Sequence, residues 1–290
     1  MDLPIVVGVD GSEPSMRAVD WAADEAALRG VALRLVYASL WERYEGVSLA
    51  QDLVKPSEQV MAEDIVRVAA ERARLRQAGV KVSTDVLPEE PEYALVRESR
   101  EAIAMVLGTR GRSGFVEMLL GSVSLTVASH AACPVIVLRG SHDNQVRAGR
   151  HGRVLLGVGE HGTDSAALRF AVQEARLRGA TLDVVRAWRC PAHESTDHPL
   201  MAGEPARLHE QHAVEVLADA LKDVPPDLEP RRRTLEGPVR QVLLAAAHEA
   251  DLLVVGARRS PERFGLQLGR VAHGVLHHAP CPVAVVPERG

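Results

Sequence analysis

Aromatic residues and cysteines are scarce in this chain, and each shortage excludes a class of protein. Aromatic residues make up only 3% of the 290 residues, which argues against a surface that stacks nucleic-acid bases. The net charge of −5 also argues against a basic footprint for a phosphate backbone. Three cysteines cannot form the disulfide framework of a small secreted domain, and they suit a reducing compartment.

A membrane-spanning segment is missing as well. Residues 118–138 contain no Asp, Glu, Lys or Arg, but glycine, serine, threonine, histidine and proline interrupt them. This segment therefore predicts a buried helix followed by a strand, not a membrane span. The N-terminus lacks the basic region and apolar core of a signal peptide. We expect a cytoplasmic protein that binds neither membrane nor nucleic acid.

Side chains with catalytic or metal-binding spacing are also lacking. Twelve histidines are present, but no Cys/His set has the spacing of a zinc site, so no metal site is predicted. No Ser/His/Asp set or pair of carboxylates stands at strand ends in a catalytic pattern. We therefore predict no catalytic residues, and whether the chain is an enzyme stays open.

What the chain does contain is a repeat. Gly108 and Gly121 recur 148 residues later as Gly256 and Gly269, and the Cys-Pro-Val sequence at Cys133 recurs with the same offset. Near the start of each copy, residues 21–30 (WAADEAALRG) match residues 170–179 (FAVQEARLRG). Each copy is long enough to form a domain, so the repeat indicates a tandem duplication.

Apolar runs of strand length alternate with helical patterns in both copies. In the first copy they predict strands near residues 5–9, 33–38, 80–86, 103–107 and 135–138, with helices between them. This alternation is typical of an α/β fold with a parallel sheet covered on both faces. We predict domains at residues 1–141 and 151–290, joined by a polar linker at 142–150.

The glycine motif of the first copy suits a phosphate. Gly108 follows the fourth predicted strand, at the sheet edge where ligands of open α/β sheets bind. Glycine lets backbone N–H groups approach a phosphate, and the helix starting at Ser122 offers free N–H groups and a favourable dipole. Asp10, at the end of the first strand, would meet the nucleoside or a bound cation. Alternatively, the glycines are only turn and packing residues.

Two better-known nucleotide motifs are alternatives to this one. No Gly-Lys-Ser/Thr triplet exists, so the chain has no Walker A loop. Residues 157–162 (GVGEHG) match the dinucleotide fingerprint, but the second strand of that copy ends in Arg186, Ala187 and Trp188. A dinucleotide site needs an acidic residue there for the ribose, so we interpret this match as fortuitous.

These residues resemble the universal stress protein family in its tandem two-domain form. The resemblance rests on residues 7–15 (VGVDGSEPS), 108–115 (GTRGRSGF), 121–124 (GSVS) and 133–135 (CPV), and it covers both copies. It implies two five-stranded parallel sheets of strand order 3-2-1-4-5. It also implies that the two domains pair through their fifth strands as an intramolecular pseudo-dimer. A protein partner is expected but not identified, and a homodimer of whole chains stays open.

By the same resemblance, the first copy binds ATP, with or without Mg²⁺. The implied adenosine contacts are Asp10 and Ala38, and the implied phosphate loop is the spaced glycine motif. The complete set of predicted binding residues is Asp10, Gly11, Ser12, Ala38, Gly108, Arg110, Gly111, Gly121, Ser122, Val123 and Ser124.

The second copy departs from this pattern. Gly159 or Glu160, depending on the alignment, takes the place of Asp10, and Arg259 and Arg270 replace Gly111 and Ser122. We expect Arg259 to fill the space of the phosphates, so that each chain binds one ATP in its first copy. An alternative is that the two arginines hold a different anion. The expected function is regulation of stress response or dormancy. The alternatives are a slow ATPase, a nucleotide-dependent transferase, or a scaffold that binds no nucleotide.

Overall fold

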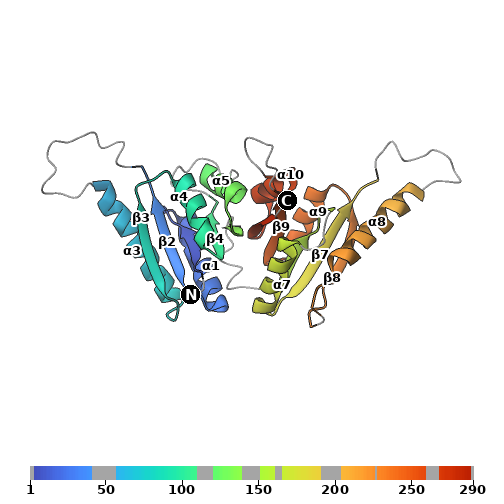
Figure 1. Ribbon diagram of the computed structural model, residues 1–290, viewed down its shortest axis with the longest axis horizontal. Helices are drawn as coiled ribbons and strands as arrows, with labels where there is room; N and C mark the ends of the chain where they lie inside the picture. The colour runs from blue at the N-terminus through green and yellow to red at the C-terminus, as the bar shows by residue number, and fades with distance from the viewer. Residues whose placement is uncertain are drawn as a thin grey trace. The chain divides into compact units, whose positions relative to one another are not determined.

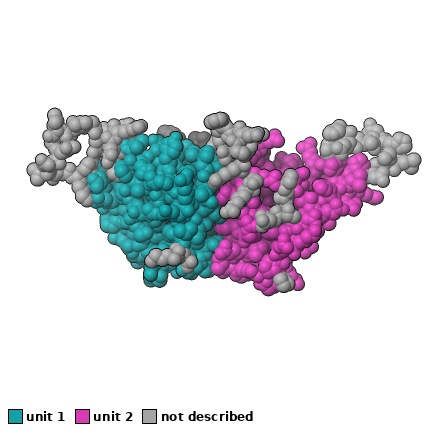
Figure 2. Space-filling model, in the orientation of Figure 1, with its two compact units in different colours: residues 1–143 teal, residues 144–290 magenta. Residues whose placement is uncertain are grey.

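A computed structural model describes residues 3–40, 57–109, 120–138, 151–160, 165–190, 204–225, 227–258 and 268–288. The chain divides into two compact units, residues 1–143 and 144–290, which Figure 2 shows in different colours. We call them unit 1 and unit 2, and each contains one copy of the repeat. The predicted linker, residues 142–150, lies outside the described residues.

Unit 1 alternates strands and helices as the sequence predicts (Figure 1). Its elements are β1 (Ile5–Gly8), α1 (Glu13–Arg29), β2 (Leu33–Ala38), α3 (Ser57–Arg76), β3 (Val82–Leu87), α4 (Pro91–Glu98), the 3₁₀ turn η1 (Ser99–Glu101), β4 (Ala104–Gly108), α5 (Ser122–His130) and β5 (Val135–Leu138). All strand pairs are parallel, in the order β3-β2-β1-β4-β5. Helix α1 packs on α3 and α4 packs on α5, so the sheet has helices on both faces.

Unit 2 repeats this arrangement. Its elements are β6 (Arg153–Gly157), α7 (Ala166–Arg178), β7 (Thr181–Trp188), α8 (Glu204–Ala220), β8 (Arg231–Glu236), α9 (Val239–Ala247), β9 (Leu252–Arg258), α10 (Arg270–His278) and β10 (Val283–Glu288). Its strands are also parallel and follow the order β8-β7-β6-β9-β10. Both sheets therefore have the predicted order 3-2-1-4-5, and the α/β fold class is confirmed.

Local signals explain where the helices begin and end. Ser12 caps α1 by accepting a hydrogen bond from the backbone N–H of Ser15, and Gly30 ends the helix with a positive φ of 67°. Helix α7 has the same two signals in Ser165 and Gly179. Because both ends are specified by short-range chemistry, the sequence predicts these helices closely.

The strand interiors form the core of each unit. The first three residues of β1, all of β4, residues 154–156 of β6 and residues 252–255 of β9 are buried. Cys133 and Cys281 lie in this core, as predicted for small apolar side chains. Burial raises the pKa of the Cys281 thiol to about 12, so this thiol stays protonated at neutral pH. No helix in the described ranges is both long and apolar enough to cross a membrane.

One ion pair is present in both units with its charges exchanged. In unit 1, Arg34 of β2 donates to Asp85 of β3 at 2.6 Å. In unit 2, Asp183 occupies the position of Arg34, and it accepts from Arg233 of β8 at 3.0 Å. The Asp183 side chain is 1% exposed, so unit 2 depends on Arg233 to neutralise a buried carboxylate.

Candidate functional site

The predicted site lies at the carboxyl edge of the unit 1 sheet, where the strand order reverses. Strand β1 is hydrogen-bonded to β2 on one side and to β4 on the other. Gly8 is paired with Val36, so continuing the register by two residues brings Asp10 opposite Ala38. Gly108 is the last residue of β4. The fold therefore brings three predicted binding residues to one crevice, the place where open α/β sheets bind ligands.

The turn after β1 holds the Asp10 carboxylate in a fixed position. Its Oδ1 accepts hydrogen bonds from the backbone N–H of Ser12 at 3.0 Å and from the Ser12 hydroxyl at 2.6 Å. Gly11 has a positive φ of 81°, and an added Cβ would lie 3.1 Å from the Ile65 side chain. Both the backbone conformation and the lack of space therefore require glycine at position 11. This turn leaves Oδ2 of Asp10 without a partner among the described residues.

Gly108 has a structural role of its own. A Cβ at this position would lie 2.7 Å from the carbonyl carbon of Pro14 and 2.9 Å from the backbone nitrogen of Ser15. The first turn of α1 therefore packs directly on the end of β4, and only glycine permits this approach. This packing is required whether or not a nucleotide binds nearby.

Further hydrogen bonds tie the two ends of the glycine motif together. The backbone N–H of Gly121 donates to the carbonyl of Thr109 at 2.7 Å. The buried Ser124 hydroxyl donates to the carbonyl of Gly108, also at 2.7 Å. Because the Ser124 hydroxyl already donates to Gly108, Ser124 supports the motif from the protein interior. Val123, the preceding residue, lies half-buried in the first turn of α5.

The N-terminus of α5 is the part of the site best suited to an anion. Gly121 is its N-cap residue, with φ −68° and ψ 151°, and no side chain in the described part of the chain caps the helix. The first N–H groups of a helix lack partners within the helix, and its dipole favours negative charge there. Helix α1 differs, because the Ser12 side chain caps it. The uncapped α5 therefore presents free donors toward the crevice edge, as a phosphate would require.

Glu92, a residue that the sequence does not point to, also lies at this edge. The Ser122 hydroxyl donates to Oε1 of Glu92, which is on α4, at 3.2 Å. A carboxylate beside an anion site competes for the same hydroxyl and repels negative charge. No short-range pattern could reveal this contact, because 30 residues separate the two side chains.

Two of the predicted residues, Arg110 and Gly111, lie outside the described residues, as does Arg259 of the second copy. Within the described ranges, no group of three or more His, Cys, Asp or Glu side chains is arranged to hold a metal ion.

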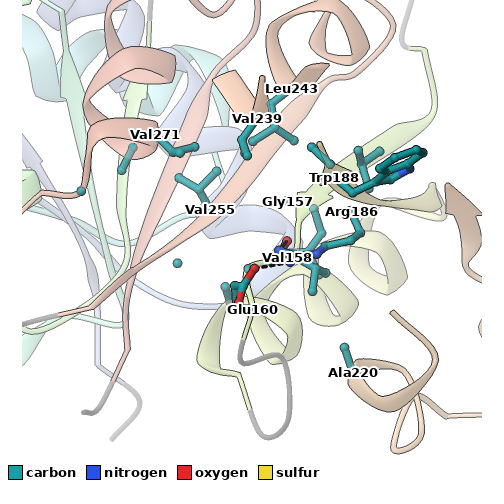
Figure 3. A pocket seen from close by; sticks show the side chains of 18 of the residues that line it. Gly157, Val158, Glu160, Arg186, Trp188, Ala220, Val239, Leu243, Val255 and Val271 are labelled. Carbon is teal, nitrogen blue, oxygen red and sulfur yellow. Dashed lines mark hydrogen bonds and ion pairs between the residues drawn. The ribbon is translucent and has the colours of Figure 1, made fainter. Parts of the chain in front are cut away.

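The corresponding crevice of unit 2 is open but chemically different. Gly157 pairs with Val185 as Gly8 pairs with Val36, so Gly159 and not Glu160 corresponds to Asp10. The crevice contains a cavity of about 990 Å³ beyond the ends of β6, β7 and β9 (Figure 3). The prediction that Arg259 excludes phosphates from this copy stays a prediction.

The Glu288 carboxylate of unit 2 binds the N-terminus of helix α7, as a separate anion would. Its carboxylate accepts hydrogen bonds from the backbone N–H groups of Ala166 at 2.8 Å and Ala167 at 3.0 Å, and from the Ser165 hydroxyl. Its Oε1 lies 2.9 Å from the position that a Cβ on Gly256 would take. Glu288 therefore satisfies the N-terminus of α7 and fills the space that the first turn of α1 fills in unit 1.

Comparison with known proteins identifies the family. The model of the universal stress protein family matches residues 3–139 and again residues 151–287. Universal stress protein Rv2005c of Mycobacterium tuberculosis is 30% identical over 305 residues, covering 98% of this chain and 97% of the relative. Universal stress protein Rv2623 of the same organism is also 30% identical, over 294 residues, with 99% and 97% coverage.

A solved structure has the same fold over the whole chain. A universal stress protein from Archaeoglobus fulgidus superposes with a TM-score of 0.67 and 19% identity, covering 98% of both chains. At this identity, the likeness concerns the fold alone. Because the family model matches both copies and relatives match over nearly the full length, this chain belongs to the universal stress protein family, in its tandem two-domain form.

Proposed function

We propose that this chain regulates a stress response or dormancy by binding ATP, with or without Mg²⁺, in the crevice of unit 1. The observation that carries the proposal is the uncapped N-terminus of α5 at the carboxyl edge of the sheet. The Asp10 carboxylate, held by the Ser12 turn, supports it from the other side of the strand-order reversal. The Asp10 carboxylate can accept hydrogen bonds from the nucleoside, and the free N–H groups of α5 can donate to its phosphates.

In this proposal, each group of residues has a defined role. Asp10 and Ala38 contact the adenosine, Asp10 by accepting hydrogen bonds from hydroxyl groups. The free N–H groups at Ser122 and Val123 bind phosphate oxygens. Gly108 and Ser124 act indirectly, since they hold β4 against α1 and α5. ATP would bring a strong negative charge to this edge, and a partner protein could recognise that change.

We further propose that only unit 1 binds ATP, so that each chain binds one molecule. Unit 2 has Gly159 in place of the Asp10 carboxylate, and Arg270 in place of Ser122 at the start of α10. The loss of the acceptor at the strand end removes the group that would receive a ribose hydroxyl.

Calorimetric titration of the full chain with ATP tests both proposals, using a matched pair of variants. Gly121 and Gly269 are N-cap residues with nearly the same backbone angles, in an extended conformation that valine can also adopt. We expect one site in the wild-type protein, loss of binding in Gly121→Val, and unchanged binding in Gly269→Val. Two equivalent sites would contradict the single-site proposal, and equal affinity in all three proteins would contradict the location in unit 1.

The alternative functions are separated by a second assay. A slow ATPase or transferase would turn over ATP, whereas a regulator only needs to bind it. Sustained phosphate release in the presence of Mg²⁺, abolished by Asp10→Ala, would favour the enzyme. A scaffold that binds no nucleotide would give no heat of binding in any of the proteins.

A further inference from the structure

We propose that the cavity of unit 2 is a second binding site with a different specificity, for a small aromatic anion whose acidic group pairs with Arg186. This inference does not depend on ATP binding by unit 1. It rests on the shape of the cavity, on a buried guanidinium in its wall, and on a reversal of polarity between the two repeat copies.

The cavity has apolar walls of a size suited to a ring-containing molecule. Its volume of about 990 Å³ reaches the upper range of small-molecule sites. The labelled residues in Figure 3 come from the ends of three strands, from the turn after β6, and from α8, α9 and α10. The apolar side chains of this wall are Val158, Val185, Val239, Leu243, Val255 and Val271. Trp188, at the end of β7, adds an aromatic surface that could pack on a flat ring.

Arg186 is the unusual member of this wall. It is 7% exposed, and its Nη2 donates to Oε1 of Glu160 at 2.8 Å, as the dashed line in Figure 3 shows. Nη1 approaches the carbonyl of Val158 at 3.4 Å, and the buried Nε has no hydrogen-bond partner among the described residues. A buried guanidinium needs acceptors for its five N–H groups, and this one is short of them.

The existing partner of Arg186 does not neutralise it strongly. The Glu160 side chain is 70% exposed, while that of Arg186 is 9% exposed. Solvent screens such a half-exposed pair, so its contribution is small. An anion that enters the cavity can therefore pair with the guanidinium in a drier environment, where charge-assisted hydrogen bonds are stronger.

Comparison with unit 1 indicates that the polarity of the crevice is inverted. The register offset of 149 residues relates Arg186 to Tyr37, and Gly159 to Asp10. Unit 1 thus presents a carboxylate acceptor at the end of its first strand, whereas unit 2 lacks the carboxylate and presents a guanidinium donor from the next strand. The crevice of unit 1 therefore suits a ligand that donates hydrogen bonds from hydroxyl groups. The crevice of unit 2 suits a ligand that accepts hydrogen bonds.

The other charged side chains around the cavity agree with an anionic ligand. The basic and histidine side chains are Arg189, Arg258, Arg270, His209 and His212. The acidic ones are Glu160, which is paired with Arg186, and Glu288, which is held by the N-terminus of α7. Cationic groups therefore predominate around the cavity, and they would attract an anion toward Arg186.

The test uses the fluorescent probe 8-anilinonaphthalene-1-sulfonate, an aromatic anion, with the full chain. We expect saturable binding of one probe per chain, with energy transfer from tryptophan. Arg186→Gln should weaken binding at least tenfold, and it should fold because the ion pair that it removes is to Glu160, whose side chain is 70% exposed. The matched control is Tyr37→Phe in unit 1, which should bind the probe like the wild-type protein.

A second variant keeps the test valid if Arg186→Gln does not fold. No atom of the described residues lies within 4 Å of a Cβ built on Gly159, so Gly159→Asp has room on that side, and it restores the carboxylate of unit 1. It should also weaken probe binding at least tenfold, with an unchanged cooperative melting curve. Failure of the wild-type protein to bind the probe, or wild-type affinity for the probe in both variants, would overturn the inference.

Competition with ATP separates this inference from the function proposed for unit 1. In Gly121→Val, where unit 1 should not bind ATP, we expect the probe to bind normally and millimolar ATP not to displace it. Displacement in that variant would overturn the inference, because the unit 2 cavity would then be an ordinary nucleotide site. Loss of ATP binding by unit 1 alone would leave the result with the probe unchanged.

Discussion

Gly108 and Gly256 are equivalent in the repeat, yet replacing each with alanine should have different effects. At position 108 the new Cβ would lie 2.7 Å from both the carbonyl carbon and oxygen of Pro14. Ordinary van der Waals contact begins near 3.4 Å, so backbone atoms must separate by about 0.7 Å. Because α1 and β4 are both anchored in the core, we expect Gly108→Ala to cost about 1–3 kcal/mol.

At position 256 the three nearest atoms to the new Cβ all belong to the side chain of Glu288, with Oε1 at 2.9 Å. A carboxylate can move aside, although it then loses part of its contact with the N-terminus of α7. We therefore expect Gly256→Ala to cost about 1 kcal/mol, the usual value of a helix cap. Gly79→Ala is the neutral control, since nothing lies within 4 Å of its Cβ.

Differential scanning calorimetry of the three variants provides the measurement. At about 3 °C per kcal/mol for a unit of this size, Gly108→Ala should lower the Tm of unit 1 by about 3–9 °C. Gly256→Ala should lower the Tm of unit 2 by about 3 °C, and Gly79→Ala should change neither transition. Wild-type stability of Gly108→Ala, or a larger loss in Gly256→Ala, would refute the assignment of Gly108 to helix packing.

Three further predictions concern single contacts. Glu92→Gln removes the charge beside Ser122, so the affinity for Mg²⁺-free ATP should rise about two- to fivefold in calorimetry; an unchanged affinity would place the phosphates elsewhere. Arg233→Met leaves the buried Asp183 carboxylate unpaired, so urea unfolding should show a loss of about 3 kcal/mol, partly recovered by adding Asp183→Asn; no loss would mean that the carboxylate has another partner. Burial raises the pKa of Cys281 to about 12, so iodoacetamide at pH 8 should label it only after unfolding, as peptide mass spectrometry can check; rapid labelling of the native protein would contradict this burial.

The sequence predicts the fold well because the signals for it are local. Apolar runs specify the buried strands, and Ser12 and Gly30 specify the ends of α1 through contacts within a few residues. The second copy shows the same alternation of strands and helices, and the family resemblance predicts the strand order. These are properties that neighbouring residues determine together, so they can be recognised without coordinates.

The candidate site is predicted less completely, for a physical reason. The sequence correctly brings Asp10, Gly108 and Gly121 to the end of the unit 1 sheet, because parallel strands align their carboxyl ends. It does not point to Glu92, whose contact with Ser122 depends on the packing of α4 against α5.

The sequence by itself determines that the chain is a tandem duplication, that each copy forms a parallel α/β sheet, and that the second copy has either Gly159 or Glu160 where the first has Asp10. Only the tertiary structure decides what replaces it. The cavity, the buried Arg186 and the Glu288 carboxylate against Gly256 bring together residues that are distant in the chain. Periodicity and spacing describe short-range order, whereas the polarity of a crevice depends on which side chains packing brings to the same edge of the sheet.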